Sequence, residues 1–210
     1  MSVTVLAPAK PIVSASLATV VYNGSVTVMP YVSGTKIDVS LACLVKGSDC
    51  VESLTVPGQG TFDVQADGSV KFTADSLFAG DIVWVTYRAT DAFGQTGENT
   101  VAINVLLPVG PIVQPVNVTV DYNKSATFTP SYTGTSVVSK CLVSALDCVS
   151  TVVVDGKGTF TVVDGVVTFV PLSTFAGDSA CVTYRVTDRW GQSSSEIGRA
   201  SCRERVSSPV

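Results

Sequence analysis

The residues best suited to chemistry in this 210-residue sequence are its cysteines, because histidine is absent. Cys43 and Cys50 are seven positions apart, and Cys141 and Cys148 repeat that spacing. Paired thiols at a repeated spacing predict two local disulfides, and stable disulfides indicate an oxidising, extracellular compartment. Four buried free thiols are the alternative. A zinc site is not expected, since histidine is missing and the spacing is not that of a metal knuckle.

Four aspartates stand near glycine in predicted turns: Asp81, Asp91, Asp178 and Asp188. Aspartate in a turn normally accepts hydrogen bonds from backbone N–H groups. A calcium site usually needs several clustered oxygens, whereas these acids stand singly. The sequence therefore favours turn chemistry. Calcium is the one cofactor left open, and no other cofactor or metal is expected.

Three further residues are candidates for contacts or reactivity. Cys181 has no partner in the pattern and falls on the predicted solvent side of a strand, with no lysine or histidine nearby in sequence. We interpret it as a small residue under a loop; a reactive thiol is the alternative. Arg88 and Arg185 are predicted to form surface cross-strand pairs, with a ligand contact as the alternative.

Catalysis is not expected from this composition. Without histidine, the commonest general base and the usual partner of a serine nucleophile are both missing. The sequence contains no glycine-rich phosphate loop and no G-x-S-x-G elbow. The net charge is −4 without a basic cluster before the C-terminal tail, so neither nucleic acid nor an anionic membrane is an expected partner. The apolar runs are too short to span a bilayer.

The sequence repeats itself after about one hundred residues. The offset between the two copies falls from 100 residues at Tyr122 to 97 residues at Phe175, so the second copy has lost three residues in loops. Five segments of the first copy recur in the second: Tyr22-Asn23 as Tyr122-Asn123, Gly60-Thr61-Phe62 as Gly158-Thr159-Phe160, Phe78-Ala79-Gly80-Asp81 as Phe175-Ala176-Gly177-Asp178, Val85-Thr86-Tyr87-Arg88 as Val182-Thr183-Tyr184-Arg185, and Thr90-Asp91 as Thr187-Asp188.

In each copy, short runs of alternating apolar and polar residues are separated by residues typical of turns. This pattern predicts an antiparallel sheet with one solvent-exposed face. Asp164-Gly165, between two alternating runs, predicts a tight hairpin turn, and Asp67-Gly68 stands at the same place in the first copy. The residues expected to face the core are Phe62, Val64, Val70, Phe72, Val83, Val85, Tyr87 and Ala89, with Phe160, Val162, Val167, Phe169, Ala180, Val182, Tyr184 and Val186 in the second copy. The predicted fold class is all-β, with two tandem immunoglobulin-like antiparallel β-sandwich repeats.

The repeat phase also sets the expected domain boundaries. Residues 1–5 match the end of the first copy, so we expect them to be the last strand of a truncated preceding repeat, and the chain to be a fragment of a longer array. The two repeats are expected at 6–106 and 107–196, joined by a short proline-rich linker. Residues 197–210 break the phase and read like a translated sequencing adapter, so we expect them to be non-native and to add nothing to the fold.

Most of residues 6–196 resembles the CshA-type fibril repeat of bacterial surface adhesins. The motifs that carry the resemblance are Val56-Pro57-Gly58-Gln59-Gly60-Thr61-Phe62, Asp67-Gly68-Ser69-Val70-Lys71-Phe72-Thr73, Phe78-Ala79-Gly80, and Val85-Thr86-Tyr87-Arg88-Ala89-Thr90-Asp91 with Gly94-Gln95. The second copy follows the same order from Gly156 to Gln192, but has Val154-Asp155-Gly156-Lys157 in place of the first motif's lead.

The resemblance implies structural stalk repeats of a secreted, cell-surface or cell-wall bacterial adhesin, with no catalytic residues. The expected partners are neighbouring repeats of the same chain and host or matrix surface molecules. The alternative is a carbohydrate- or protein-binding β-sandwich module of an extracellular protein. Such a binder should expose an aromatic platform in both repeats. Trp84 stands opposite Cys181 in the alignment of the two copies, and this mismatch argues against a shared platform.

Overall fold

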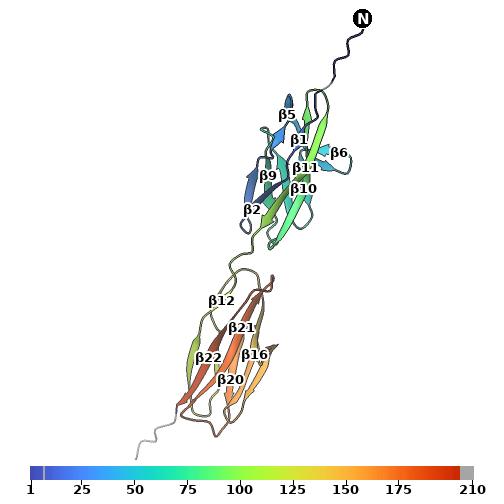
Figure 1. Ribbon diagram of the computed structural model, residues 1–210. Helices are drawn as coiled ribbons and strands as arrows, with labels where there is room; N and C mark the ends of the chain where they lie inside the picture. Colours follow the sequence, from blue (N-terminus) through green and yellow to red (C-terminus); the bar gives the residue numbers. More distant parts are fainter. Residues whose placement is uncertain (7, 204–210) are drawn as a thin grey trace, which may run out of the picture. The chain divides into compact units, whose positions relative to one another are not determined.

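A computed structural model describes residues 1–6 and 8–203 of the protein. The regular secondary-structure elements in these ranges are all β-strands. The chain divides into two compact units between Pro108 and Val109, inside the proline-rich linker. Figure 1 shows that each unit has its own set of strands. In the described residues there is no helix of the length and apolarity needed to cross a membrane.

The first unit is a sandwich of a five-stranded and a four-stranded sheet, with a small strand pair beside them. The larger sheet has the order β2-β11-β10-β5-β6, the smaller sheet β3-β9-β8-β7, and the small pair is β1-β4. The strands are β1 (Ile12–Val13), β2 (Ser16–Val20), β3 (Ser25–Val28), β4 (Val32–Ser33), β5 (Ile37–Lys46), β6 (Asp49–Val51), β7 (Ser53–Val56), β8 (Gly60–Val64), β9 (Val70–Ala74), β10 (Asp81–Asp91) and β11 (Thr96–Val105).

The second unit repeats this architecture strand for strand. Its sheets have the orders β13-β22-β21-β16-β17 and β14-β20-β19-β18, and its small pair is β12-β15. The strands are β12 (Ile112–Val113), β13 (Val116–Asp121), β14 (Ala126–Phe128), β15 (Tyr132–Thr133), β16 (Val137–Ser144), β17 (Asp147–Val149), β18 (Thr151–Val154), β19 (Gly158–Val163), β20 (Val166–Pro171), β21 (Ser179–Asp188) and β22 (Ser193–Arg203).

Each sandwich has its own hydrophobic core, built from the alternating residues that the sequence predicts to face inward. Phe62 packs against Phe72 with ring centroids 4.6 Å apart, and Phe160 against Phe169 at 4.4 Å. All sixteen predicted core residues are buried except Val64, which is half-buried. The two cores form separate clusters, so each repeat buries apolar surface without help from the other.

The two hairpin turns predicted from Asp-Gly differ from each other. Asp164 and Gly165 both have positive φ and form the two-residue turn between β19 and β20, as predicted. In the first repeat Val64 pairs with Val70, so the loop has five residues and only Gly68 has positive φ. The equivalence of the two turns was therefore wrong in detail. The carboxylate of Asp67 accepts hydrogen bonds from N and Oγ of Ser69, which stabilises the longer loop.

The C-terminal segment differs most from the sequence-based expectation. Residues 197–203 complete β22, which pairs with β21 on one side and β13 on the other. The expectation that this segment adds nothing to the fold is wrong for residues 197–203. Pairing in a sheet uses backbone N–H and C=O groups, which this segment supplies to both neighbouring strands. Its inward-facing Ala200 is small and fully buried, so the segment also fits the core. Residues 204–210 lie outside the described part of the chain.

Residues 1–5 form no strand in this structure. A last strand of a preceding repeat would find its partners in that repeat, so this assignment stays a prediction.

Candidate functional site

The first and last long strands of the first repeat lie side by side and run parallel. Residues Ser16–Val20 of β2 pair with Val101–Val105 of β11 in a continuous register. The other strand pairs of this sheet are antiparallel, as expected from the sequence. The parallel pair arises because β2 runs along the free edge of β11, whose other edge is occupied by β10.

The second repeat has the same parallel pair. Residues Val116–Asp121 of β13 pair with Gly198–Arg203 of β22. The segment that breaks the repeat phase therefore supplies the whole β22 side of this pair. Sequence reasoning missed the terminal pair in both repeats, because alternation in a five-residue strand predicts which face is buried but not which strand lies beside it.

Parallel terminal strands have a mechanical consequence. Tension applied to the two ends of a repeat pulls β2 toward its N-terminal end and β11 toward its C-terminal end. Because the strands are parallel, these forces point in opposite directions along the pair and load its hydrogen bonds in shear. The bonds of a sheared pair must break together, whereas an antiparallel pair pulled from one end opens one bond at a time. The geometry therefore suits each repeat to resist stretching.

Both disulfides expected from the cysteine spacing are present, one in each repeat. Cys43 is bonded to Cys50, and Cys141 to Cys148, with a Cα–Cα distance of 5.5 Å in both. In each repeat the bond joins two neighbouring antiparallel strands across a short connection, β5 to β6 and β16 to β17. Each disulfide therefore fixes the strand at one edge of the larger sheet.

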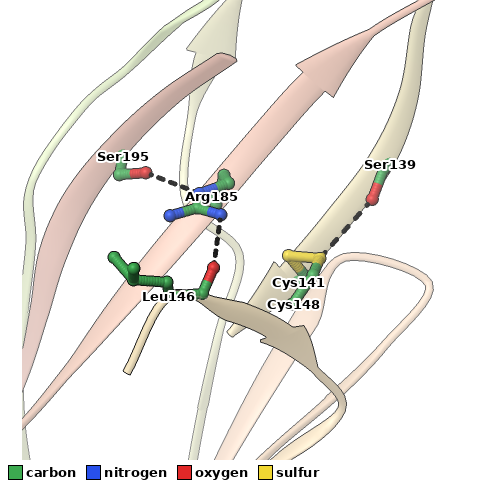
Figure 2. Close-up of a disulfide and its surroundings, with 6 residues drawn as sticks. All are labelled: Ser139, Cys141, Leu146, Cys148, Arg185 and Ser195. Atoms are coloured by element: carbon green, nitrogen blue, oxygen red, sulfur yellow. Dashed lines mark hydrogen bonds between the residues drawn. A yellow bond between two sulfur atoms is a disulfide. The ribbon is translucent and has the colours of Figure 1, made fainter. Parts of the chain in front are cut away.

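An arginine lies beside each disulfide on the outer face of the larger sheet. Arg88 stands opposite Cys43 and forms an ion pair with Glu98 on β11, with Nε 2.7 Å from Oε1. Arg185 stands opposite Cys141 and donates to Ser195 Oγ (3.2 Å) and Leu146 O (3.1 Å), as Figure 2 shows. The predicted cross-strand pairing of Arg88 is present as an ion pair, while Arg185 makes neutral hydrogen bonds.

In the part of the chain that the structure describes, the buried charged residues are Asp91 and Asp188, at 1% and 2% exposure. Asp91 Oδ1 accepts from the backbone N of Phe93 and Gln95, and Oδ2 accepts from Gln95 Nε2 at 3.0 Å. A buried carboxylate is stable only when hydrogen bonds replace its hydration.

Asp188 repeats this arrangement with Trp190 and Gln192, at 2.9 Å for all three bonds. These two aspartates therefore close the turn between the last two long strands, which is the turn chemistry that the sequence favours.

Asp81 and Asp178 also engage N–H groups, at the start of β10 and β21. Asp81 Oδ1 accepts from the backbone N of Ile82 at 2.7 Å, and Asp178 Oδ1 from that of Ser179 at 2.7 Å. Lys157 Nζ lies 2.8 Å from Asp178 Oδ2, and this ammonium is the main reason why the pKa of Asp178 lies below its usual value. Across residues 1–6 and 8–203, no three acidic or cysteine side chains gather in the way a metal site requires.

Two tyrosines at equivalent core positions differ in their hydrogen bonding. Tyr87 Oη donates to Gly68 O at 3.0 Å, whereas the buried Tyr184 Oη has no partner in the described part of the chain. Burial is the main cause that raises the pKa of both phenols.

Among the described residues, the outer faces of the two larger sheets share no aromatic platform. Trp84 is 62% exposed on β10, and the equivalent residue on β21 is the exposed free thiol Cys181. The solvent-side position expected for Cys181 is confirmed, but the residue is exposed, so the interpretation that it lies under a loop is wrong.

Comparison with known proteins gives one family and one fold. The model of the surface adhesin CshA repetitive domain matches residues 5–105 and 114–197. No curated protein matches the chain.

Among solved structures, titin domains Z1Z2 in complex with telethonin superpose with a TM-score of 0.51, at 13% identity, over 96% of this chain and 100% of that one. The four N-terminal immunoglobulin domains of a Dscam1 isoform give a TM-score of 0.37 at 14% identity, over 95% of this chain and 47% of that one. The first of these comparisons shows a tandem immunoglobulin-like fold. The family match spans both sandwiches in tandem, and the chain therefore belongs to the surface adhesin CshA repetitive domain family.

Proposed function

We propose that the two repeats are stalk segments of a secreted bacterial adhesin, which hold a binding region away from the cell and carry tension between the cell and the bound surface. The observation that carries this proposal is the parallel pairing of the terminal strands in each repeat. A stalk module has to keep its fold while its two ends are pulled apart, and strands loaded in shear meet that demand.

The cysteine pairs support a location outside the cell, at the cell surface or in the cell wall. Structural disulfides persist in oxidising compartments and are rare in the cytosol. Both repeats carry one at the same position, joining β5 to β6 and β16 to β17. The surface adhesin family to which the chain belongs points to the same location.

The linker sequence supports an extended arrangement of repeats. Pro108 and Pro111 bracket Val109 and Gly110, and proline restricts the backbone on both sides. The partners we propose for each repeat are its neighbours in the same chain. Host or matrix molecules would be bound by other parts of such an adhesin.

Small-angle scattering from the whole chain tests the stalk arrangement. Two modules in line predict a pair-distance distribution with a shoulder at the separation of the two module centres. A single symmetric peak, as from one compact particle, would contradict the proposal. Replacing Pro108 and Pro111 together by glycine is the matched variant, and it should broaden the distribution by loosening the joint.

A further inference from the structure

The linker that enters the first repeat is bound to that repeat before its first strand begins. Gln95, in the turn between β10 and β11, donates from Nε2 to Pro8 O at 3.0 Å. Asn99 of β11 donates from Nδ2 to Val13 O at 2.9 Å. Pro11 lies between these two contacts in the sequence and is buried. The entering segment is thus held by side chains that stand 87 and 86 positions later in the chain.

A buried carboxylate fixes the orientation of the Gln95 amide. Nε2 also donates to Asp91 Oδ2 at 3.0 Å, so the two N–H groups of the amide have one acceptor in the turn and one in the linker. Asp91 is itself held by the backbone N of Phe93 and of Gln95. A flipped amide would turn its oxygen toward two acceptors and lose both bonds. Asp91 therefore positions Gln95 as a donor to the linker.

The buried proline of the linker fits between two glycines. A Cβ built on Gly97 of β11 would clash with Pro11 O, and one built on Gly34 would lie 3.2 Å from Pro11 Cα. Glycine at these places lets the linker backbone approach the sandwich closely. In the second repeat Ser194 stands in place of Gly97, and its Oγ accepts from the backbone N of Val113 at 3.2 Å.

The second repeat holds its entering linker with equivalent residues. Gln192 donates from N and Nε2 to Asp188, both at 2.9 Å. A Cβ built on Gly110 would lie 3.3 Å from Gln192 Oε1, so the linker backbone passes beside this amide. Pro111 is buried, and a Cβ on Gly134 would lie 2.8 Å from its Cα. The aspartate and glutamine of the turn and the second linker proline therefore occupy the same place in both repeats.

We propose that the turn glutamines Gln95 and Gln192 are positioning residues that clamp the entering linker onto each repeat, so that the repeat and its linker move as one body. Proline fixes φ but leaves ψ free to rotate. The direction of the Pro8 carbonyl depends on ψ, and the bond from Gln95 fixes that direction. The inference rests on the proposed stalk function and adds the device that stiffens its joints.

Relaxation of ¹⁵N nuclei in the whole chain measures the clamp at Ala9 and Lys10, which lie between the two prolines of the first linker. We expect backbone order parameters of about 0.85 at both residues, as in a rigid strand. Gln95→Ala removes the amide, whereas Asp91 keeps its two backbone partners. The order parameters of Ala9 and Lys10 should then fall below about 0.6, while those of β10 and β11 are retained.

Two further variants separate the clamp from general effects of substitution. Gln192→Ala makes the same change in the second repeat and should leave Ala9 and Lys10 unchanged. Gln95→Glu keeps the aliphatic stem but cannot donate to Pro8 O as a carboxylate, so it should free the linker as alanine does.

Unchanged linker order in both Gln95 variants would overturn the clamp, and so would an equal loss in Gln192→Ala. Low order at Ala9 and Lys10 in the unaltered chain would overturn it as well. A loss that extends over β10 and β11 would show that Gln95 only stabilises the fold, which also contradicts a positioning role. These outcomes leave the parallel terminal strands of the stalk proposal untouched, because that pairing is tested by stretching the chain.

Discussion

Phe128 and Gly198 face each other across the core of the second repeat. A Cβ placed on Gly198 would lie 3.3 Å from both Cε2 and Cζ of the Phe128 ring. The strand registers put Val28 and Val101 at the equivalent positions of the first repeat. A large side chain on β14 therefore compensates for the missing side chain on β22, whereas two valines share the same space in the first repeat.

This compensation predicts that substitutions at Phe128 and Gly198 have non-additive effects on the free energy of unfolding of the second repeat. Phe128→Val should destabilise the second repeat by about 1–3 kcal/mol through an unfilled cavity. Gly198→Val should also destabilise it, by about 1–3 kcal/mol through overpacking against the ring. The double variant recreates the pair of the first repeat and should lose at least about 1 kcal/mol less than the sum of the single variants. Urea unfolding of the four chains measures this cycle, and additive losses would show that the two residues do not share space.

Truncation after Glu196 tests the contribution of the C-terminal segment to the fold. The loss of residues 197–203 removes seven of the eleven residues of β22 and leaves β13 without the neighbour it has in this structure. Calorimetry should show the transition of the second repeat lowered by many degrees or abolished, while that of the first repeat is unchanged. Truncation after Arg203 is the control, and we expect it to leave both transitions in place. Two unchanged transitions after the shorter truncation would mean that residues 197–203 do not hold the sheet together.

How far the sequence predicts this fold depends on whether a pattern is local. The alternation around Phe62 and Phe72 indicates correctly which residues are buried, because period two is a property of each strand alone. The cysteines stand at the same spacing and the same place in both repeats, which predicts their pairing correctly because each pair lies within one hairpin. The parallel β2–β11 pair was not predictable in this way, because its paired residues are 85 positions apart in the sequence and no local pattern links them.

The C-terminal segment also shows that local sequence patterns do not determine which strands pair. The side chains of residues 197–203 do not match the repeat pattern, so the sequence analysis placed these residues outside the second repeat. Strand pairing depends first on backbone groups, and Gly198 and Ala200 are small enough to face inward.

The buried turn aspartates should matter more than any exposed acid. Asp188→Ala leaves two backbone N–H groups and the Gln192 amide without their acceptor, and should destabilise the second repeat by about 3 kcal/mol. Asp91→Ala should do the same to the first repeat. Asp155→Ala, an exposed turn residue, is the control and should cost less than about 0.5 kcal/mol. Thermal unfolding measures each change, and a loss for Asp188→Ala no larger than the control would contradict this role.

Calcium gives a second measurement on the same turns. The carboxylates of Asp91 and Asp188 already accept N–H groups, so we expect calcium and chelator to give the same melting temperatures. A rise of several degrees with calcium that is lost in Asp91→Ala or Asp188→Ala would identify these turns as cation sites.

The ion pair between Lys157 and Asp178 predicts a pH-dependent difference between two chains. Lys157 lowers the folded-state pKa of Asp178, so the stabilisation is present above the unfolded pKa of about 3.9 and disappears as the pH falls through the folded value. Lys157→Gln introduces the residue of the first repeat, Gln59, and removes the charge. The difference in melting temperature between the two chains should be small at neutral pH, because the pair is exposed, and should vanish in acid. A difference that stays constant below pH 3 would rule out this pair as its source.

Pulling a single molecule by its two ends tests the stalk account most directly. Each repeat should unfold in one cooperative event, because the parallel terminal strands are loaded in shear and the cores are separate. Two force peaks per molecule are therefore predicted. Reduction of the disulfides should lengthen each event by about 20 Å, since each bond bridges a sequence separation of seven residues at a Cα–Cα distance of 5.5 Å. Gradual extension without force peaks, or a single event for the whole chain, would contradict two independent modules built to carry tension.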